Sequence, residues 1–452
     1  MKPGLKNHYW LKSGFLTMLQ NIAVVFFGFS SFYILVRVLD KSSFGAWALF
    51  IATTSIMEVI RNGLIQNGLI KFLSFSEKEN HSKIISASFT INAVLSLTCL
   101  ILIFLFADFL SNVWEFPQLT RMFYIYSLAY ILTGILAQFQ FVQQANLRFT
   151  GIFLSVLIRQ GTFFVFILTC YIMRIEFQLI SLVYMQIVSA FFGMTIIYLY
   201  ARKNISFSFD SHLYWIKKLF NFGKYAFGTS VSSMLFNSIS QLMLGGLLST
   251  SAAGVYNIAL RITNLVEIPT SSVASIVFPQ SARRMETDGK QAVKYLYEKS
   301  VGAILALLIP ILFFIFLFSD FVINIIAGKN YSEATSILQI TILYCLLIPY
   351  GRQFGTLLDS IGKPKLTFSI VLLCACMNTA FNYILINRLG VIGAAYGTLL
   401  ANSIGFIIGQ IILRKELGVN FFNTLIYAKN FYFDFFNKYL RSSLVKIFPG
   451  RF

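Results

Sequence analysis

Charged residues are scarce in this chain of 452 residues. Asp, Glu, Lys and Arg together make up 12% of it, and only 17 residues are acidic. A soluble domain carries about twice that share of charge, so this chain has too little polar surface to cover a water-soluble globule. The composition excludes a soluble enzyme and a disordered chain. It also excludes a disulfide scaffold, since the chain has only five cysteines.

The motifs of several enzyme classes are missing as well. The sequence contains no G-x-x-x-x-G-K-[ST] loop, no H-E-x-x-H and no G-x-S-x-G, so it has no signature of a P-loop ATPase, a zinc peptidase or a serine hydrolase. The five cysteines fall in apolar segments and the three histidines in polar ones, so they do not combine into a metal site. We expect no cofactor, no metal and no catalytic residue, and hence a protein that is not an enzyme.

Apolar residues dominate instead. They form 57% of the chain, with 49 Phe and 22 Tyr, and the mean hydropathy is +0.74. About 20 apolar residues allow a helix to cross a bilayer, so the sequence predicts an all-α polytopic membrane protein with about 12 transmembrane helices. The predicted spans are 13–36, 43–68, 84–107, 122–145, 150–173, 177–200, 222–247, 252–278, 301–325, 332–358, 366–387 and 391–413.

The distribution of basic residues tests this assignment of spans. With the N-terminus in the cytoplasm, 26 of the 36 Lys and Arg residues lie in cytoplasmic segments or at the cytoplasmic end of a span, 6 in outer loops and 4 further inside spans. Positive charge favours the cytoplasmic side, so this ratio predicts an even number of spans with both termini inside. It also accounts for most of the net charge of +19 without nucleic acid as a partner.

The two halves of the chain are similar to each other. A shift of 209 residues aligns Gly45 and Glu58 with Gly254 and Glu267, and a nearby shift of 212 matches the ends of the third and ninth spans. Each half then contains six spans in the same orientation, which is a parallel repeat with a substrate site between the halves. We predict an N-terminal six-helix lobe over 1–210, a C-terminal six-helix lobe over 211–413 and a tail over 414–452.

The predicted tail is rich in aromatic and basic residues. The aromatic residues are Phe421, Phe422, Tyr427, Phe431, Phe433, Phe436 and Tyr439, and the basic residues between them include Lys429, Lys438, Arg441 and Lys446. This composition is typical of an amphipathic helix on the surface of an anionic leaflet. We therefore expect the tail to lie at the cytoplasmic interface of the membrane.

Seven ionisable residues lie inside spans or near their ends. A charge at the bilayer centre costs roughly 2.5–3.5 kcal/mol, so such side chains normally face the bundle interior or a wet cavity. Arginines outnumber acids among them, and a positive interior indicates an anionic ligand; the planar guanidinium suits phosphate. The candidate substrate-binding residues are Arg61, Arg159, Arg261 and Arg352, and the candidates for ion coupling or pairing are Glu58, Glu267 and Asp359. Interhelical ion pairs that only hold the bundle together are the alternative.

Three stretches resemble a known family. They are 14–47, with D-K-S-S-F-G-A-W at its end, G-V-Y-N-I-A-L-R at 254–261 and G-K-P-K at 362–365. The sequence is similar here to the O-antigen and exopolysaccharide flippases, which are polysaccharide biosynthesis proteins of the multidrug/oligosaccharidyl-lipid/polysaccharide (MOP) exporter superfamily. The resemblance extends over nearly the whole chain in span number, two-lobed repeat and loop lengths, and it implies a MATE-like fold.

The resemblance also implies a function. Such a protein would be a transporter of the bacterial inner (plasma) membrane that flips undecaprenyl-pyrophosphate-linked oligosaccharide, an O-antigen or exopolysaccharide repeat unit, from the cytoplasmic to the periplasmic leaflet. Flippases of this kind are thought to use alternating access through a cationic central cavity, a character that the four arginines match. The implied partners are the lipid-linked oligosaccharide, the lipid bilayer and other membrane proteins of polysaccharide assembly, with no nucleic acid.

Two other functions stay open. A multidrug or peptidoglycan-lipid-precursor exporter would belong to the same superfamily, but a drug-cation exporter should have an acidic cavity, and the precursor flippases usually carry more than twelve spans. A polytopic polysaccharide polymerase or lipid-linked glycosyltransferase usually needs a large outer loop with catalytic charges. The longest outer loop, 108–121, contains only Asp108, Glu115 and Arg121 as charged residues, which argues against such an enzyme.

Overall fold

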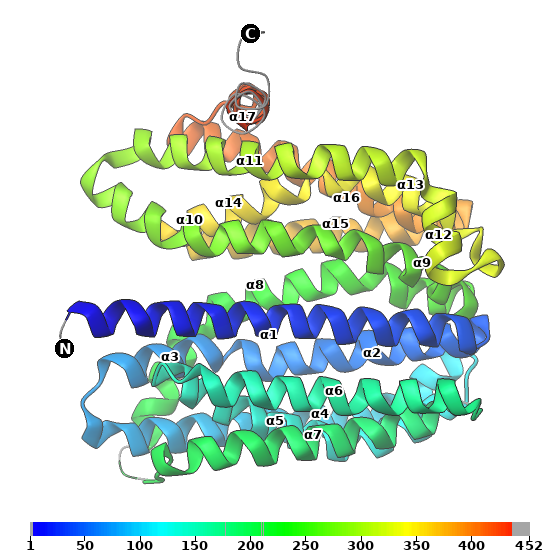
Figure 1. The fold of residues 1–452 in the computed structure, drawn as a ribbon, viewed down its shortest axis with the longest axis horizontal. Helices are drawn as coiled ribbons and strands as arrows, with labels where there is room; N and C mark the ends of the chain where they lie inside the picture. The colour runs from blue at the N-terminus through cyan, green and yellow to red at the C-terminus, as the bar shows by residue number, and fades with distance from the viewer. Residues whose placement is uncertain (1–2, 177, 209, 211, 436–452) are drawn as a thin grey trace, which may run out of the picture. The chain divides into compact units, whose positions relative to one another are not determined.

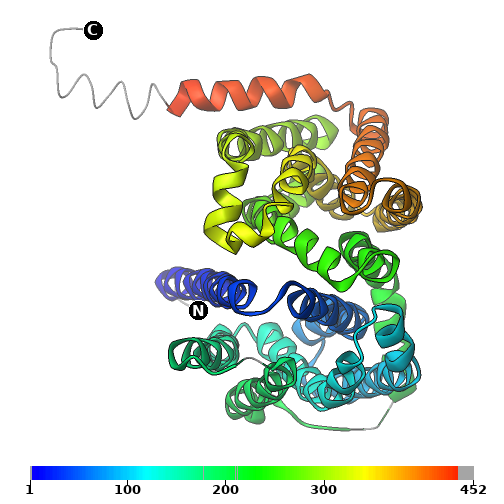
Figure 2. The same ribbon diagram turned by 90° about the vertical axis from the view of Figure 1, so that its right-hand side faces the viewer.

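The computed structural model describes residues 3–176, 178–208, 210 and 212–435, and their side chains between residues 15 and 433. Regular secondary structure in these residues is helical throughout, as the sequence predicts. The helices are α1 (Pro3–Val38), α2 (Lys41–Gly63), α3 (Gln66–Phe75), η1 (Lys78–Asn80), α4 (His81–Val113), α5 (Gln118–Ala145), α6 (Phe149–Met173), α7 (Leu179–Ala201), η2 (Arg202–Asn204), α8 (His212–Leu247), α9 (Thr250–Thr263), η3 (Asn264–Val266), α10 (Glu267–Thr287), α11 (Gly289–Leu317), α12 (Ser319–Ala327), η4 (Lys329–Tyr331), α13 (Ala334–Cys345), α14 (Ile348–Ser360), α15 (Pro364–Leu389), α16 (Val391–Leu417) and α17 (Phe421–Phe435). The long helices of each part of the chain run side by side in Figure 1 and are seen end-on in Figure 2.

Each predicted span falls on one long helix or on two consecutive shorter ones. Among the described residues, ten helical stretches are long and apolar enough to cross a membrane. The other two predicted spans, 222–247 and 252–278, correspond to α8 and to α9 with α10, which are helical but more polar. The chain is therefore a multi-pass membrane protein, and the prediction of an all-α polytopic fold is confirmed.

Several spans are interrupted part-way. A turn at Leu64 and Ile65 separates α2 from α3, the 3-10 turn Asn264–Val266 separates α9 from α10, and a turn at Leu346 and Leu347 separates α13 from α14. Lipid offers no partner for the backbone groups that such a break frees, so broken helices occur where protein or water is adjacent. These breaks therefore mark places where the backbone is covered by neighbouring protein, as at Leu64 and Ile65, or meets water.

The chain divides into two compact units, residues 1–254 and residues 255–452. In the first unit α8 packs closely on α2. A Cβ on Gly223 would lie 2.3 Å from the carbonyl oxygen of Leu64, and a Cβ on Gly245 would lie 2.6 Å from the side chain of Leu49. By its packing α8 therefore joins the six spans that precede it. The lobes over 1–210 and 211–413 follow the sequence repeat, and that division stays a prediction.

Each unit has its own apolar core. In the first unit the core includes Ile65, Leu69, Ile84, Val142 and Leu219, which come from the α2–α3 turn, α3, α4, α5 and α8. In the second unit it includes Val293, Val301, Leu357, Leu413 and Ala428, which come from α11, α14, α16 and α17. The core of the second unit thus extends into the predicted tail.

Most of the described part of the tail forms α17, which crosses α11 instead of running along it. Figure 1 shows α17 end-on and Figure 2 shows it lengthwise. Glu298 on α11, only 2% exposed, accepts hydrogen bonds from the backbone N–H of Asn420 at 2.8 Å and from Nδ2 of Asn423 at 2.9 Å. At the crossing, a Cβ on Gly302 would lie 2.7 Å from the carbonyl oxygen of Thr424. The start of the tail is therefore fastened to the second unit.

The predicted tail also includes residues at the end of α16 and exposed residues of α17. Residues 414–417 complete α16, and Phe422, Leu425, Ile426 and Phe433 of α17 are exposed. These exposed apolar side chains are compatible with an interfacial helix, which stays a prediction. Phe436, Lys438, Tyr439, Arg441 and Lys446 lie outside the described residues.

Candidate substrate-binding site

Arg61 is fully buried near the end of α2 in the first unit. Its Nη1 donates to the carbonyl oxygen of Tyr130, its Nη2 donates to Oγ1 of Thr133 at 3.2 Å, and its Cζ lies 4.1 Å from the centre of the Tyr130 ring. Gly134 leaves room for this group, because a Cβ there would lie 3.0 Å from Nη1. A carbonyl, a hydroxyl and an aromatic face of α5 thus hold the charge, and none of the side-chain surface is open.

Glu58 lies one turn before Arg61 but has a different partner. Tyr126 on α5 donates its hydroxyl hydrogen to Oε1 of Glu58 at 3.2 Å. The same hydroxyl lies within electrostatic range of both Arg61 and Arg159. No direct ion pair joins Glu58 to Arg61 in the part of the chain that the structure describes. The two residues that could pair along α2 therefore both bind α5 instead.

Arg159 lies on α6 and is partly buried. Its Nε is buried and has no hydrogen-bond partner among the described residues. The same holds for Oδ1 of Asn92 on α4, whose side chain also approaches Gly134 beside Arg61. The first unit thus gathers acidic, basic and polar side chains near Tyr126 and leaves some of their hydrogen-bonding capacity unused.

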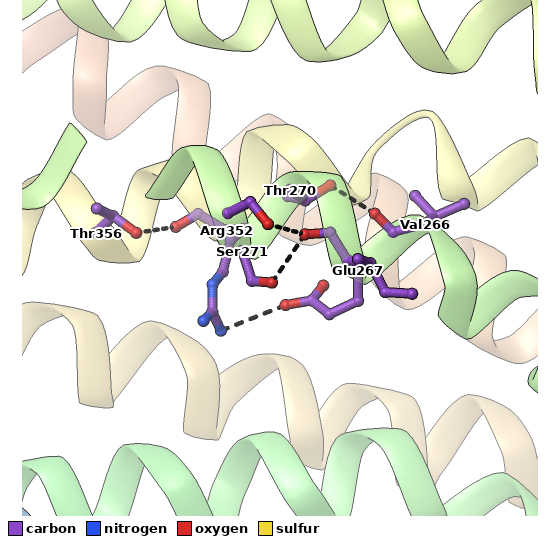
Figure 3. A network of polar contacts seen from close by, with 8 residues as sticks. Val266, Glu267, Thr270, Ser271, Arg352 and Thr356 are labelled. Atoms are coloured by element: carbon purple, nitrogen blue, oxygen red, sulfur yellow. Dashed lines mark hydrogen bonds and ion pairs between the residues drawn. The ribbon is translucent and has the colours of Figure 1, made fainter. Parts of the chain in front are cut away.

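In the second unit Arg352 and Glu267 form an ion pair. Nη1 of Arg352 on α14 lies 3.4 Å from Oε1 of Glu267, the first residue of α10 (Figure 3). The side chains are 50% and 45% exposed, although both residues lie well inside predicted spans. A charged group exposed to hydrocarbon would cost several kcal/mol. This face of the second unit therefore has to meet water or a polar ligand.

Further hydroxyl groups lie at exposed or partly exposed positions of α10 and α14, which pack on each other. On α10, Ser271 and Ser272 both donate to the carbonyl oxygen of Ile268, at 3.1 and 2.8 Å. On α14, Thr356 donates to the carbonyl oxygen of Arg352 at 2.9 Å (Figure 3). We call the exposed and partly exposed set Glu267, Ser271, Ser272, Ser275, Arg352, Thr356 and Asp359 the α10–α14 polar face.

The two remaining candidates lie in the second unit as well. Asp359 is exposed in the last turn of α14, two turns after Arg352 and on the same side of that helix. Arg261 lies on α9, six residues before Glu267, and is partly buried. The seven residues thus form a cluster in the first unit and a polar face in the second, with Arg261 preceding that face. Their roles in substrate binding and ion coupling stay predictions.

Sequence reasoning missed the groups that hold these charges. Tyr126, Tyr130 and Thr133 recur at i, i+4 and i+7, which is the spacing of one helix face and could have identified a polar stripe on α5. The serines of α10 were another available signal, because residues 267–275 contain few large apolar side chains for a span.

A separate polar pocket of about 450 Å³ lies at the adjoining ends of α4 and α5. Its lining residues are Asp108, Ser111, Asn112, Pro117, Thr120, Arg121 and Tyr124. The hydroxyl of Tyr124 donates to Oδ2 of Asp108 at 3.4 Å. None of the seven predicted site residues lines this pocket.

The sequence is similar to a protein family and to individual flippase-like proteins. A family described as polysaccharide biosynthesis protein matches residues 34–336. The probable low-salt glycan biosynthesis flippase Agl15 of Haloferax volcanii is 26% identical over 205 residues, which are 45% of this chain and 43% of that protein. The lipopolysaccharide biosynthesis protein WzxC of Escherichia coli K12 is 20% identical over 412 residues, which are 88% of this chain and 80% of that protein. The matched region thus spans less than half the length of Agl15 but most of WzxC.

Solved structures identify the fold. An inward-facing multidrug resistance MATE family transporter of the MOP superfamily is similar with a TM-score of 0.74 at 16% identity, over 88% of this chain and 94% of that one. This structural similarity, together with the membrane-spanning helices, defines a multi-pass membrane protein with the MOP-exporter fold. The chain belongs to the polysaccharide biosynthesis protein family, whose match covers about two thirds of its residues. The resemblance seen in the sequence is confirmed at the level of this family.

Proposed function

We propose that this protein is a flippase for a lipid-linked oligosaccharide in the inner (plasma) membrane. Its substrate is an O-antigen or exopolysaccharide repeat unit on undecaprenyl pyrophosphate, and it moves this unit from the cytoplasmic to the periplasmic leaflet. Both termini lie in the cytoplasm, and other membrane proteins of polysaccharide assembly supply and consume the substrate. Membership of the family and the names of its relatives support this proposal. The observation that carries it is the half-exposed Arg352–Glu267 pair inside the spans.

Different groups of the protein suit different parts of the substrate. The candidate groups for the pyrophosphate are the guanidiniums of Arg159 in the first unit and of Arg261 and Arg352 in the second, because planar guanidinium donors form bidentate hydrogen bonds with phosphate oxygens. The glycan occupies wet space beside the α10–α14 polar face, where hydroxyl groups can exchange hydrogen bonds with sugars. The polyprenyl chain stays in lipid. Alternating access through a cationic central cavity then exposes the head group to one side of the membrane at a time.

Arg61 differs from the other three arginines. It is among the predicted substrate-binding residues, but its guanidinium is enclosed by Tyr130 and Thr133. Binding a phosphate would require it to leave these partners, so the proposal depends on the other three arginines. Glu58, Glu267 and Asp359 remain the candidates for coupling transport to an ion gradient.

The proposal is tested by replacing each of Arg159, Arg261 and Arg352 with Ala in a strain that depends on this gene for its surface polysaccharide. We expect the surface polysaccharide to be lost while the amount of protein in the membrane stays normal. Arg388→Ala is the matched control, because Arg388 is exposed at the end of α15. Normal polysaccharide in all three variants would remove the anion-binding site.

A multidrug or peptidoglycan-lipid-precursor exporter is the second candidate, because the fold is shared with a multidrug transporter. A deletion strain separates the two functions. Accumulation of an undecaprenyl-pyrophosphate-linked oligosaccharide supports the flippase and identifies its glycan. Accumulation of the peptidoglycan precursor, or drug sensitivity with normal lipid-linked intermediates, supports the exporter.

A further inference from the structure

The ion pair between Arg352 and Glu267 has a single contact. A single pair of atoms, Nη1 and Oε1, lies within ion-pair distance, at 3.4 Å, and both side chains are about half exposed. Within the part of the chain that the structure describes, the guanidinium makes no other side-chain hydrogen bond or ion pair. Most of its donors are thus free to bind a second group while Glu267 occupies one edge.

An exposed pair with one long contact contributes little, because solvent screens it and two flexible side chains must be held in place. A phosphate can instead form two parallel hydrogen bonds with one guanidinium, which is the stronger arrangement. A phosphate group that reaches Arg352 therefore competes favourably with the carboxylate of Glu267. The carboxylate has room to turn away, since its side chain is 45% exposed.

The position of Glu267 explains why a carboxylate lies there at all. It begins α10 directly after the 3-10 turn Asn264–Val266, at a place where its carboxylate reaches Arg352 on α14. Without this neighbour, Arg352 would be an uncompensated charge inside a span whenever no ligand is bound. Such a charge strongly opposes closure of the surrounding protein.

We propose that Glu267 is a built-in counter-anion, which occupies Arg352 in the unloaded protein and is displaced by the phosphate of the substrate. This inference rests on the proposed function, because it concerns the same anion site. Glu267 then regulates that site. Its carboxylate lowers the affinity of Arg352 for phosphate and neutralises the charge of Arg352 when no substrate is bound. The empty protein can then return for another substrate.

The test is a binding titration of inorganic pyrophosphate to the purified full-length protein, followed by isothermal calorimetry. Glu267→Gln removes the competing charge but keeps the size of the side chain, and we expect the Kd to fall about two- to fivefold. Arg352→Ala should weaken binding at least tenfold. The matched control is Asp320→Asn, which removes an exposed acid of α12, outside the polar face, and it should leave the Kd unchanged.

A double variant separates specific competition from a general change of charge. In the Arg352→Ala background Glu267→Gln should have no further effect, because the group for which the carboxylate competes is gone. Surface polysaccharide should also fall in Glu267→Gln cells despite the tighter binding, since return of the empty carrier becomes slower. Equal tightening in both backgrounds, or in Asp320→Asn, would overturn the inference.

The outcomes also distinguish this inference from the proposed function. If Arg352→Ala weakens binding and Glu267→Gln leaves the Kd unchanged, the anion site stands and the counter-anion is wrong. If Arg352→Ala leaves pyrophosphate binding unchanged, or the unaltered protein does not bind pyrophosphate, the role of Arg352 in substrate binding fails and the inference fails with it.

Discussion

Gly45 on α2 and Gly254 on α9 lie face to face, and the 209-residue repeat aligns them with each other in the sequence. A Cβ on Gly254 would lie 3.0 Å from Cα of Gly45. A Cβ on Gly45 would lie 1.7 Å from the carbonyl oxygen of Thr250, and Oγ of Ser42 is 2.8 Å from Oγ1 of Thr250. Two glycines thus allow the starts of these helices to approach backbone to backbone, as small residues do in membrane interfaces.

We predict that Gly45→Ala strongly destabilises the protein. The new methyl group would meet a backbone carbonyl that no rotamer change can move, so the helices have to separate. The cost should reach or exceed about 3 kcal/mol, the upper part of the range for overpacking. It is measured as loss of the monodisperse peak when detergent-solubilised protein is heated before size-exclusion chromatography. Gly28→Ala is the control, since a Cβ there has nothing within 4 Å; equal stability of the two variants would contradict the prediction.

A second prediction concerns the attachment of α17. Glu298→Ala leaves the backbone N–H of Asn420 and the side-chain amide of Asn423 without their acceptor. Each lost hydrogen bond to a charged group costs about 1.5–3 kcal/mol, so α17 should open more often while the spans stay folded. Hydrogen–deuterium exchange of residues 420–433 should increase and that of α15 should not. Glu286→Ala, at an exposed acid of α10, is the control. Unchanged exchange in α17 would show that its other contacts, such as the packing of Ala428 in the core, hold it without these hydrogen bonds.

Glu298 also shows where prediction from the sequence ends. The spans could be predicted because a bilayer requires long apolar runs, and Glu58 and Arg352 stood out as charges within such runs. Glu298 lies in a segment that the sequence assigns to soluble loops, and it is buried only because α17, more than 120 residues later, covers it. Arg61 was found, but its enclosure by Tyr130 depends on how α2 meets α5. Tertiary contacts of this kind leave no local pattern in the sequence.

A third prediction concerns pH and the start of α2. Asp40 lies before the helix, and its Oδ1 accepts a hydrogen bond from the backbone N–H of Ser43 at 2.9 Å. Hydrogen bonding from Ser43 lowers the pKa of Asp40. A carboxyl group with a lowered pKa stabilises the fold above its unfolded-state pKa of about 3.9, and this contribution is lost as the pH falls through the lower, folded-state value.

Two replacements of Asp40 distinguish the effect of helix capping from the effect of the negative charge. Asp40→Ala should cost about 0.5–2 kcal/mol at neutral pH, whereas Asp40→Asn should cost little, because both Asp and Asn cap helices well. The difference between the unaltered protein and Asp40→Ala should shrink at acid pH, and the stability of Asp40→Asn relative to Asp40→Ala should change less with pH. Thermal unfolding in detergent over a series of pH values measures this. A difference that does not depend on pH would exclude the carboxylate as the cap.

The last prediction tests whether the α10–α14 polar face is wet. In a background with Ala at Cys374 and Cys376, which are the cysteines with exposed surface, Ser272→Cys and Ser275→Cys should react with a membrane-impermeant maleimide. Water allows a thiol to ionise and the reagent to reach it, whereas hydrocarbon prevents both. Phe313→Cys is the control, because Phe313 is 62% exposed on the apolar helix α11 and should face lipid. It should label only after denaturation. If the two serine positions label as slowly as Phe313→Cys, the polar face is dry, and the half-exposed Arg352–Glu267 pair no longer indicates a path for a hydrated head group.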